Sequence, residues 1–386
     1  MTSDYFRNLF DSYKEIQLKN RYIQNDHILP LLENYKEIFR VKQIGFSVLG
    51  EPIHSIQIGT GSKKILMWSQ MHGNESTTTK AIFDICNVFA NSSNVDMQQI
   101  QSNCTILIVP ILNPDGAKLY TRLNANSIDL NRDAKNLSQP ESKVLRGLFD
   151  DFKPDFCFNL HGQRTIFGVG DTSNTATLSF LSPAQDEGST ITETRKKAME
   201  VISVMNKLLQ TQIPNQIGIY DDTYNENCVG DTFQALHCPT ILFEAGHYKE
   251  DYNREITRFY MFEAILSSLM YISNNEVSGD LYEPYLNIPE NNKSFLDIII
   301  RQTTIILNNK SETVDIGIQY VETLKNGIIE FVPKVEKIGD LSNLNGHRNI
   351  LAQNKEFSLQ GQDVLAEGLV VETVFLKNIK YSLKLT

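Results

Sequence analysis

The sequence lacks the features of disulfide-rich, membrane-spanning and repetitive proteins. Its 386 residues include only five cysteines, an odd number, and no two of them form a Cys-x-x-Cys pair. At least three of these cysteines lie in apolar runs, so we interpret them as reduced thiols of a core and not as a disulfide framework or a zinc knuckle. No apolar stretch reaches the length of about 20 residues that a membrane span needs. We also find no internal repeat and no low-complexity tract.

The chain also has no excess of basic residues. The chain has 36 Lys and Arg against 46 Asp and Glu, a formal net charge of −10, which argues against nonspecific binding to nucleic acid or to anionic membranes. The beginning of the chain is polar and is soon interrupted by Asp11, Lys14 and Glu15. This pattern is unlike a signal peptide, so we expect a cytoplasmic protein. We expect residues 1–35 to form an N-terminal helical extension.

Apolar runs alternate with amphipathic segments over residues 36–274. This alternation predicts an α/β fold in which helices cover both faces of a sheet. The hydrophobic content of 41% is enough for one large core and a smaller one, so we expect two domains. The predicted strands are 64–70, 105–109, 156–160 and 240–244, and the predicted helices are 80–89, a segment after Pro140, 193–209 and 253–273.

The pattern changes after residue 274. Residues 275–292 are polar and contain proline, as is typical of a linker. Short β-rich runs follow, separated by Asn, Gly and Lys, and they predict a smaller C-terminal all-β domain over 293–386, a sandwich or a barrel. These runs are 296–300, 303–307, 316–320, 328–332 and 369–375.

Two of the predicted strands lead into histidines. The run before residue 70 continues to His72, and the run 156–160 ends at His161. Open α/β sheets bind ligands at the carboxyl ends of their strands. A helix predicted to open at Ser76 carries Glu75 in its first turn, close to His72. Because hydrolytic zinc sites use three nitrogen or oxygen ligands and leave a fourth position for water, these three residues form a candidate zinc site.

Two arginines lie between these histidines. Arginine's planar fork binds a carboxylate with two parallel hydrogen bonds, although either Arg122 or Arg132 alone could equally be a solvated surface charge. The segment Asn113-Pro114-Asp115-Gly116 precedes them, and we interpret it as a turn without chemistry.

In their order along the chain, these motifs resemble those of the zinc carboxypeptidase family, also called the M14 family. The matching pattern is His-x-x-Glu, Asn-Pro-Asp-Gly, an Arg, Asp-x-Asn-Arg, a lone His, and a Glu on a late strand. The interval from Glu75 to His161 is short, as in bacterial members. The resemblance implies a carboxypeptidase-like mixed sheet flanked by helices over 36–274, and it does not extend to the last hundred or so residues.

The resemblance also assigns the metal and the base. It implies one zinc ion per chain, held by His72, Glu75 and His161. It implies that Glu244, at the end of the predicted strand 240–244, is the general base that takes a proton from the attacking water.

Further roles follow from the same resemblance. Arg122 corresponds to the arginine that stabilises the oxyanion, and Asn131 and Arg132 correspond to the pair that binds the free terminal carboxylate of the substrate. The family also uses a mobile tyrosine that closes over the substrate. Tyr224 is our candidate from its spacing to the later Gly-Asp, and Tyr220 is the alternative.

The sequence therefore predicts a zinc-dependent hydrolase that cleaves an amide bond next to a free carboxylate, best interpreted as a metallocarboxypeptidase. Its expected substrate is a peptide or an acylated amino acid. The alternatives are an N-acyl amino acid deacylase resembling aspartoacylase or succinylglutamate desuccinylase, a murein-peptide amidase, and a non-catalytic binding protein. Asp231 could pair with a cationic substrate side chain or orient its own loop. The sequence leaves the oligomeric state and the side-chain specificity open.

Overall fold

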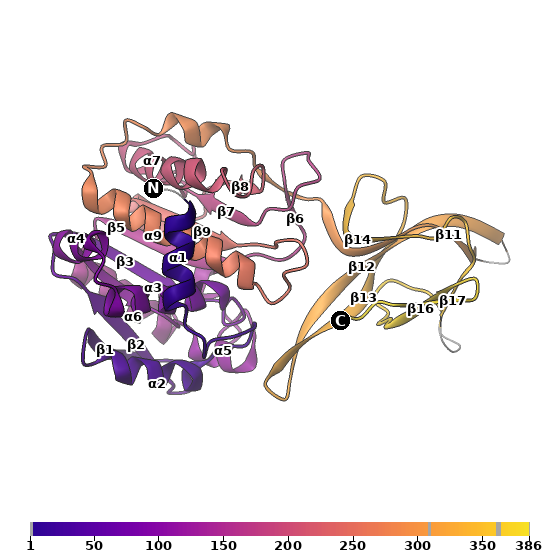
Figure 1. The fold of residues 1–386 in the computed structure, drawn as a ribbon, viewed down its shortest axis with the longest axis horizontal. Helices are drawn as coiled ribbons and strands as arrows, with labels where there is room; N and C mark the ends of the chain where they lie inside the picture. The colour runs from indigo at the N-terminus through magenta and orange to yellow at the C-terminus, as the bar shows by residue number, and fades with distance from the viewer. Residues whose placement is uncertain (1–2, 308–309, 360–363, 386) are drawn as a thin grey trace. The chain divides into compact units, whose positions relative to one another are not determined.

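A computed structural model describes residues 3–307, 310–359 and 364–385. The chain divides into two compact units (Figure 1). The first comprises Met1–Gln163 and Ala176–Asn291, and the second comprises Arg164–Thr175 and Asn292–Thr386. No sequence feature pointed to the assignment of residues 164–175 to the second unit. The domain boundaries drawn from the sequence stay a prediction.

Eight of the described strands form one mixed sheet in the first unit. Its central strands β4, β3, β5 and β9 are parallel, and β2 and β7 join them antiparallel on either side. The order across the sheet is β1 (Arg40–Phe46), β2 (Pro52–Ile58), β4 (Cys104–Val109), β3 (Lys63–Ser69), β5 (Phe156–Gly162), β9 (Thr240–Ala245), β7 (Leu178–Leu181) and β8 (Ile217–Ile219).

Helices cover both faces of this sheet, as the sequence predicted. They are α1 (Ser3–Tyr13), α2 (Asn25–Tyr35), α3 (Thr77–Asn91), α4 (Val95–Asn103), α5 (Pro114–Leu119), α6 (Pro140–Phe152), α7 (Glu193–Leu209), α8 (Val229–Ala235) and α9 (Glu255–Asn274), with 3-10 turns at Leu130–Arg132 and Glu283–Asn287. Among the described residues, no helix has the length and apolar character needed to span a membrane.

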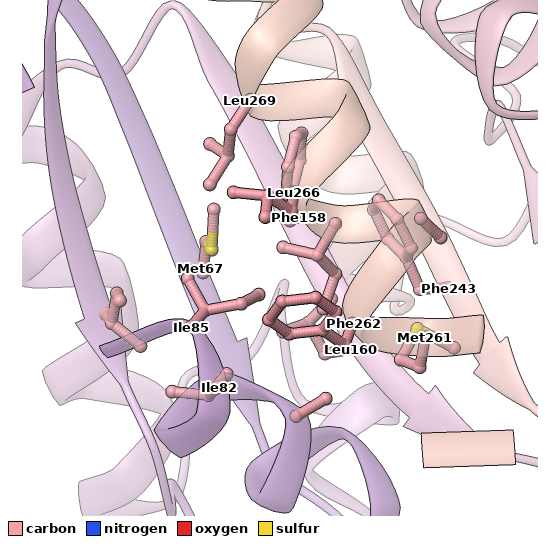
Figure 2. Packing of buried hydrophobic residues seen from close by; sticks show 14 of the residues in the cluster. Met67, Ile82, Ile85, Phe158, Leu160, Phe243, Met261, Phe262, Leu266 and Leu269 are labelled. Carbon is pink, nitrogen blue, oxygen red and sulfur yellow. The ribbon is translucent and has the colours of Figure 1, made fainter. Parts of the chain in front are cut away.

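The alternation of side chains along β3 shows how the two faces are packed. Met67 joins a cluster with residues of α1, α3, α7 and α9, and Figure 2 shows it close to Phe158 and α9. Trp68, the next residue, joins a second cluster with residues of α6 and α8. Because successive residues of a strand point to opposite faces, a strand buried on both sides must be a continuous apolar run, which is the signal that identified it in the sequence.

The described residues of the second unit form β strands and connecting loops without a helix, as the sequence predicted for the C-terminal region. A four-stranded sheet has the order β13 (Ile328–Gly339), β12 (Lys310–Lys325), β11 (Phe295–Leu307) and β14 (Asn345–Leu351). The runs 296–300 and 303–307, expected as two strands, form the single strand β11, because an irregularity between Ile300 and Thr303 interrupts its register without ending it. The remaining strands are β6 (Phe167–Val169) with β10 (Asn291–Lys293), and β15 (Phe357–Leu359), β16 (Thr373–Leu376) and β17 (Ile379–Ser382).

Candidate metal centre and active site

The carboxyl ends of β3, β5 and β9 meet at one edge of the sheet. His72 follows β3, while His161 lies near the end of β5 and Glu244 near the end of β9. His161 and Glu244 are direct neighbours across the parallel β5–β9 pair. Glu75 precedes α3, close in sequence to His72. The structure therefore brings together the three expected metal ligands and the expected base, as strand ends at a single sheet edge allow.

The three ligand side chains converge on a single point. His72 Nδ1 lies 2.9 Å from Glu75 Oε1, His161 Nδ1 lies 3.0 Å from Glu75 Oε2, and the two Nδ1 atoms are 3.1 Å apart. Tetrahedral zinc with bonds of about 2.0–2.1 Å would hold its donor atoms about 3.3 Å apart. Among the residues that the structure describes, this is the one group of three such side chains that could hold a metal ion. Two nitrogens and a carboxylate at these separations fit zinc.

Asp129 fixes the orientation of the first histidine. Its Oδ1 lies 2.9 Å from His72 Nε2, and its Oδ2 accepts hydrogen bonds of 3.1 and 3.0 Å from Nε and Nη2 of Arg122. A carboxylate on the distal nitrogen of a metal-binding histidine sets its tautomer and its ring orientation. We had given Asp129 no role from the sequence. The feature that could have identified Asp129 as a functional residue is its position as the first residue of Asp-x-Asn-Arg, directly before the residues expected to bind the substrate.

Arg122 contacts the metal site as well as Asp129. Its Nη1 donates to Glu75 Oε1 over 3.3 Å, and about half of its side chain is exposed. Burial alone would raise the pKa of Glu75, but the two histidines hold this pKa well below its usual range. Likewise, burial would raise the pKa of Asp129, whereas His72 and Arg122 lower it. Both carboxylates are therefore ionised at neutral pH.

Glu244 has one carboxylate oxygen without a hydrogen-bond partner among the described residues, although the charges of Arg122 and Arg254 favour its ionised form. The residue is partly buried, and this oxygen, Oε2, is itself buried. Burial, together with the Glu75 carboxylate, raises the pKa of Glu244 well above its usual range. A buried carboxyl group with a free oxygen can hold and return a proton.

The expected substrate clamp lies in the 3-10 turn Leu130–Arg132, directly after Asp129. The backbone N–H of Asn131 donates to Asp129 Oδ1 over 2.9 Å, while its side-chain Oδ1 accepts from the Val229 N–H at 3.1 Å. Arg132 is exposed and donates from Nη1 to the Asn131 carbonyl at 2.7 Å and to Cys228 Sγ at 3.0 Å. Asp129 thus joins the clamp to the metal site, because one Oδ1 atom contacts both.

Of the two candidate tyrosines, Tyr220 is the one whose surroundings include the site. Burial and the carboxylates of Glu244 and Glu75 raise its pKa, and Asn291 forms a hydrogen bond with its side chain. The pKa of Tyr224 is raised by burial and by the carboxylates of Glu226, Asp231 and Glu187, none of which is an expected metal ligand or the expected base. The role assigned to Tyr224 and the alternative assignment to Tyr220 both stay predictions.

Asp231 lies in the first turn of α8, near the clamp. Burial raises its pKa to about 7, whereas a hydrogen bond from Cys228 and the charge of Arg132 act in the opposite direction. The sequence-based alternatives of binding a substrate cation or orienting the loop both stay predictions.

The segment Asn113-Pro114-Asp115-Gly116 is not a free turn. Asn113 caps α5, and its Oδ1 accepts from the Gly116 N–H at 2.9 Å, while Asp115 is buried and accepts from the Ser47 hydroxyl at 2.8 Å. The interpretation as a turn was therefore wrong, because Pro114 at the first helical position with a capping Asn before it starts a helix.

Comparison with known proteins supports the family suggested by these motifs. The family model for zinc carboxypeptidases matches residues 26–260. Carboxypeptidase SOL1 of Arabidopsis thaliana is 29% identical over 169 residues, which are 38% of this chain and 34% of that protein. Gamma-D-glutamyl-L-diamino acid endopeptidase 1 of Lysinibacillus sphaericus is 37% identical over 83 residues, 20% of this chain and 21% of that protein. The chain thus spans about a third or less of the length of these curated relatives.

Solved structures show the same fold. The metallo-carboxypeptidase of Burkholderia cenocepacia superposes with a TM-score of 0.51 at 16% identity, covering 64% of this chain and 69% of that one. A metallo-carboxypeptidase of Pseudomonas aeruginosa, solved in complex with (2-guanidinoethylmercapto)succinic acid, gives a TM-score of 0.51 at 17% identity, covering 64% and 68%. Since the family model covers more than half of the chain, this protein belongs to the zinc carboxypeptidase family.

Proposed function

We propose that this chain is a zinc-dependent metallocarboxypeptidase that removes the C-terminal residue of a peptide. The observation that carries the proposal is the convergence of His72, Glu75 and His161 beside Glu244 at the ends of three adjacent strands. Membership of the zinc carboxypeptidase family supports it.

Zinc would be held by Nδ1 of His72, Nδ1 of His161 and the carboxylate of Glu75. When bound, such an ion lowers the pKa of a water molecule to about 7 and polarises a carbonyl group. Asp129 keeps the His72 ring in position through Nε2, so that Nδ1 is directed to the ion.

Glu244 is the general base in this proposal. Its Oε2 atom, buried and without a hydrogen-bond partner among the described residues, accepts the proton of the attacking water and then returns it to the leaving amine. Arg122 lies beside Glu75 and Asp129 with about half of its side chain exposed, where its charge can stabilise the oxyanion that forms during the attack.

Asn131 and Arg132 hold the terminal carboxylate of the substrate. Arg132 is exposed, and within the described part of the chain its guanidinium donates through Nη1 alone, so the other nitrogens can bind a carboxylate. The side-chain oxygen of Asn131 already accepts the Val229 N–H, which leaves its amide N–H groups to donate. We assign Tyr220, and not Tyr224, as the tyrosine that faces the bound substrate, because its electrostatic neighbours are Glu244 and Glu75.

Metal analysis combined with hydrolysis tests this function. Purified protein is assayed for zinc and then for cleavage of a panel of C-terminally free peptides, their amidated counterparts, a γ-D-glutamyl-diamino acid peptide and an N-acylaspartate, each with and without a chelator. We expect one zinc per chain and chelator-sensitive cleavage of free peptides that zinc restores. Zinc-independent cleavage, or a chain that binds no zinc, would overturn the proposal, and exclusive cleavage of the acyl amino acid would favour a deacylase.

A further inference from the structure

The loop that carries two of the metal ligands is held on both sides by the same distant segment. Before His72, Gln70 donates from Nε2 to the carbonyl of Ile23 over 3.0 Å. After Glu75, the hydroxyl of Ser76 donates to the carbonyl of Arg21. The two contacts bracket the ligands, and both use backbone carbonyls of residues 21–23.

The whole side-chain amide of Gln70 takes part in hydrogen bonds. The side chain is fully buried. Its Nε2 also donates to the Gly73 carbonyl at 2.8 Å, and its Oε1 accepts from the Thr79 hydroxyl at 2.8 Å. Each polar atom of the amide thus has a partner. Gln70 has a φ of +44°, a region that residues other than glycine seldom occupy. The three hydrogen bonds offset the cost of this backbone conformation.

The Ser76 hydroxyl contacts the 21–23 segment instead of capping its own helix. It is the N-cap residue of α3, yet its side chain makes no capping hydrogen bond. A serine at this position usually accepts from a backbone N–H of its own helix. Here the hydroxyl is buried and directed to the Arg21 carbonyl, 55 residues away in the sequence. The helix start is therefore tied to the 21–23 segment instead of being capped.

The 21–23 segment is itself anchored to the core. Arg21 donates from Nη1 to the Tyr252 carbonyl at 3.2 Å. Just before the segment, the Leu18 carbonyl accepts at 2.7 Å from Arg258. Arg258 is fully buried on α9 and paired with Asp84 of α3 at 2.6 Å. A buried arginine that is fully paired fixes the chain that it binds.

A further contact reaches the segment that leads to Arg122. The hydroxyl of Tyr22 donates to the Lys118 carbonyl at 2.8 Å, and the Tyr22 ring packs against Tyr120, with 6.4 Å between the ring centroids. Three consecutive residues thus contact the loop that carries Glu75 and the segment that leads to Arg122.

We propose that residues 21–23 act as a brace for the zinc site, and that Gln70 and Ser76 are positioning residues that connect the brace to the loop carrying His72 and Glu75. This inference rests on the proposed function, since it assumes that these side chains bind zinc. Ligands that are held in place before the ion arrives bind it more tightly. Loss of a group that hydrogen-bonds a metal ligand directly weakens metal binding by about 10–100-fold, and Gln70 and Ser76 act one step further from the ion.

Zinc affinity of the full-length protein tests the brace independently of hydrolysis. The dissociation constant is measured by competition with a chromophoric chelator. Gln70→Glu keeps the size of the side chain but replaces the donor that binds Ile23 and Gly73, so we expect zinc binding to weaken by about 10-fold, the lower end of the range for a direct partner of a ligand. Ser76→Ala removes one hydroxyl without loss of a helix cap, and we expect a loss of at least about 3-fold. If Gln70→Glu does not fold, Ser76→Ala decides the question.

Two variants serve as controls. Gln17→Glu makes the same substitution on an exposed side chain of the N-terminal region. Ile272→Ala removes buried atoms on α9, where the Ile272 carbonyl accepts from Lys63 at the opposite end of β3 from the ligand loop. We expect both controls to bind zinc like the wild type, although Ile272→Ala will lower the melting temperature.

The possible outcomes distinguish failure of the brace from failure of the proposed function. Unchanged zinc affinity in the Gln70 and Ser76 variants, or an equal loss in Ile272→Ala, would overturn the brace while the proposed function stands. A wild-type chain that binds no zinc would overturn the proposed function itself.

Discussion

The two units of the molecule bury their strands in different ways. In the first, β3 ends in five consecutive buried residues, and its two sides face separate hydrophobic clusters. In the second, β12 is buried only around its middle, and Ile306, Ile328 and Leu351 are each more than three-fifths exposed. A parallel sheet covered on both faces leaves the ends of its strands as the place for polar side chains. The candidate site therefore lies in the unit with the more completely buried sheet.

The largest effect that we expect comes from removing a ligand. His161→Ala takes away one of three donors at the end of β5, so the protein should lose stoichiometric zinc and all measurable hydrolysis. His347→Ala is the matched change in the second unit, where Nε2 of His347 lies 2.7 Å from the Thr165 carbonyl. Metal analysis should show full zinc occupancy in that control. Zinc loss in both variants would contradict the assignment of the site to the first unit.

Replacing the base should separate metal binding from turnover. Glu244→Gln keeps the shape of the side chain but cannot accept a proton, so kcat should fall by about 10²–10⁴-fold while zinc content stays at one per chain. Steady-state kinetics and metal analysis measure the two quantities on the same sample. A variant with near wild-type kcat would show that Glu244 is not the base.

The core of the first unit should be the more sensitive to truncation. Phe158 is fully buried between the sheet and α9 (Figure 2), so Phe158→Ala should lower the free energy of unfolding by about 3–5 kcal/mol. Ile328→Ala in the second unit changes a side chain that is 64% exposed and should cost less than about 0.5 kcal/mol. Denaturant titration followed by circular dichroism measures both variants, because the single Trp68 lies in the first unit and its fluorescence would follow that unit alone. Similar losses in both variants would remove the contrast between the two cores.

The clamp should act on one class of substrate. Arg132→Ala removes a charged donor worth about 1.5–3 kcal/mol, so KM for peptides with a free carboxylate should rise by about 10–100-fold, while amidated peptides should be hardly affected. Arg146→Ala, which removes a surface pair with Asp150, is the control. Equal effects on free and amidated peptides would exclude Arg132 from carboxylate binding.

The last expected effect, which does not involve the site, is a dependence of stability on pH. Burial raises the pKa of Glu263 on α9 to about 7, above its ordinary value of 4.5, although Gln212 donates to it. The folded state therefore binds this proton more tightly than the unfolded state, and stability decreases as pH rises from 4.5 to 7. Glu263→Gln should remove up to about 3 kcal/mol of this decrease, since one pKa unit corresponds to about 1.4 kcal/mol.

Unfolding free energies at pH 5 and pH 8 measure the difference. Glu276→Gln, on an exposed residue that follows α9, should leave the pH dependence unchanged. A wild-type stability that does not decrease between these pH values would contradict the assigned role of Glu263.

The sequence predicted the centre of the fold better than its edges. The four central strands are continuous apolar runs, because both of their faces are buried, and each was predicted within two residues of its observed bounds. We did not predict β1, β2, β7 and β8. β8 has only three residues, and every residue of β1 is exposed or half-buried. Short or one-sided strands carry too little apolar periodicity to be recognised.

The candidate site also has residues that the sequence predicted and residues that it did not. His72, Glu75 and His161 could be predicted because they follow apolar runs at recognisable spacing. Asp129 was not assigned a role, because no local pattern reveals that an aspartate contacts a histidine 57 residues away. The choice between Tyr220 and Tyr224 depends on a segment between β8 and α8 that has no regular structure, where periodicity gives no information.

The second unit combines two segments that lie far apart in the sequence, and this arrangement affects the order of folding. Its 164–175 segment is synthesised directly after the strand that carries His161, but the partners of that segment come much later in the chain. Ile166 accepts from the Phe295 N–H at 3.1 Å, and the Thr165 hydroxyl accepts from Gln319 at 2.7 Å. More than a hundred further residues are synthesised before these partners of the segment exist. Because contacts of high sequence separation form slowly, we expect the second unit to fold after the first. A chain that ends near residue 291 would keep the 164–175 segment without these partners.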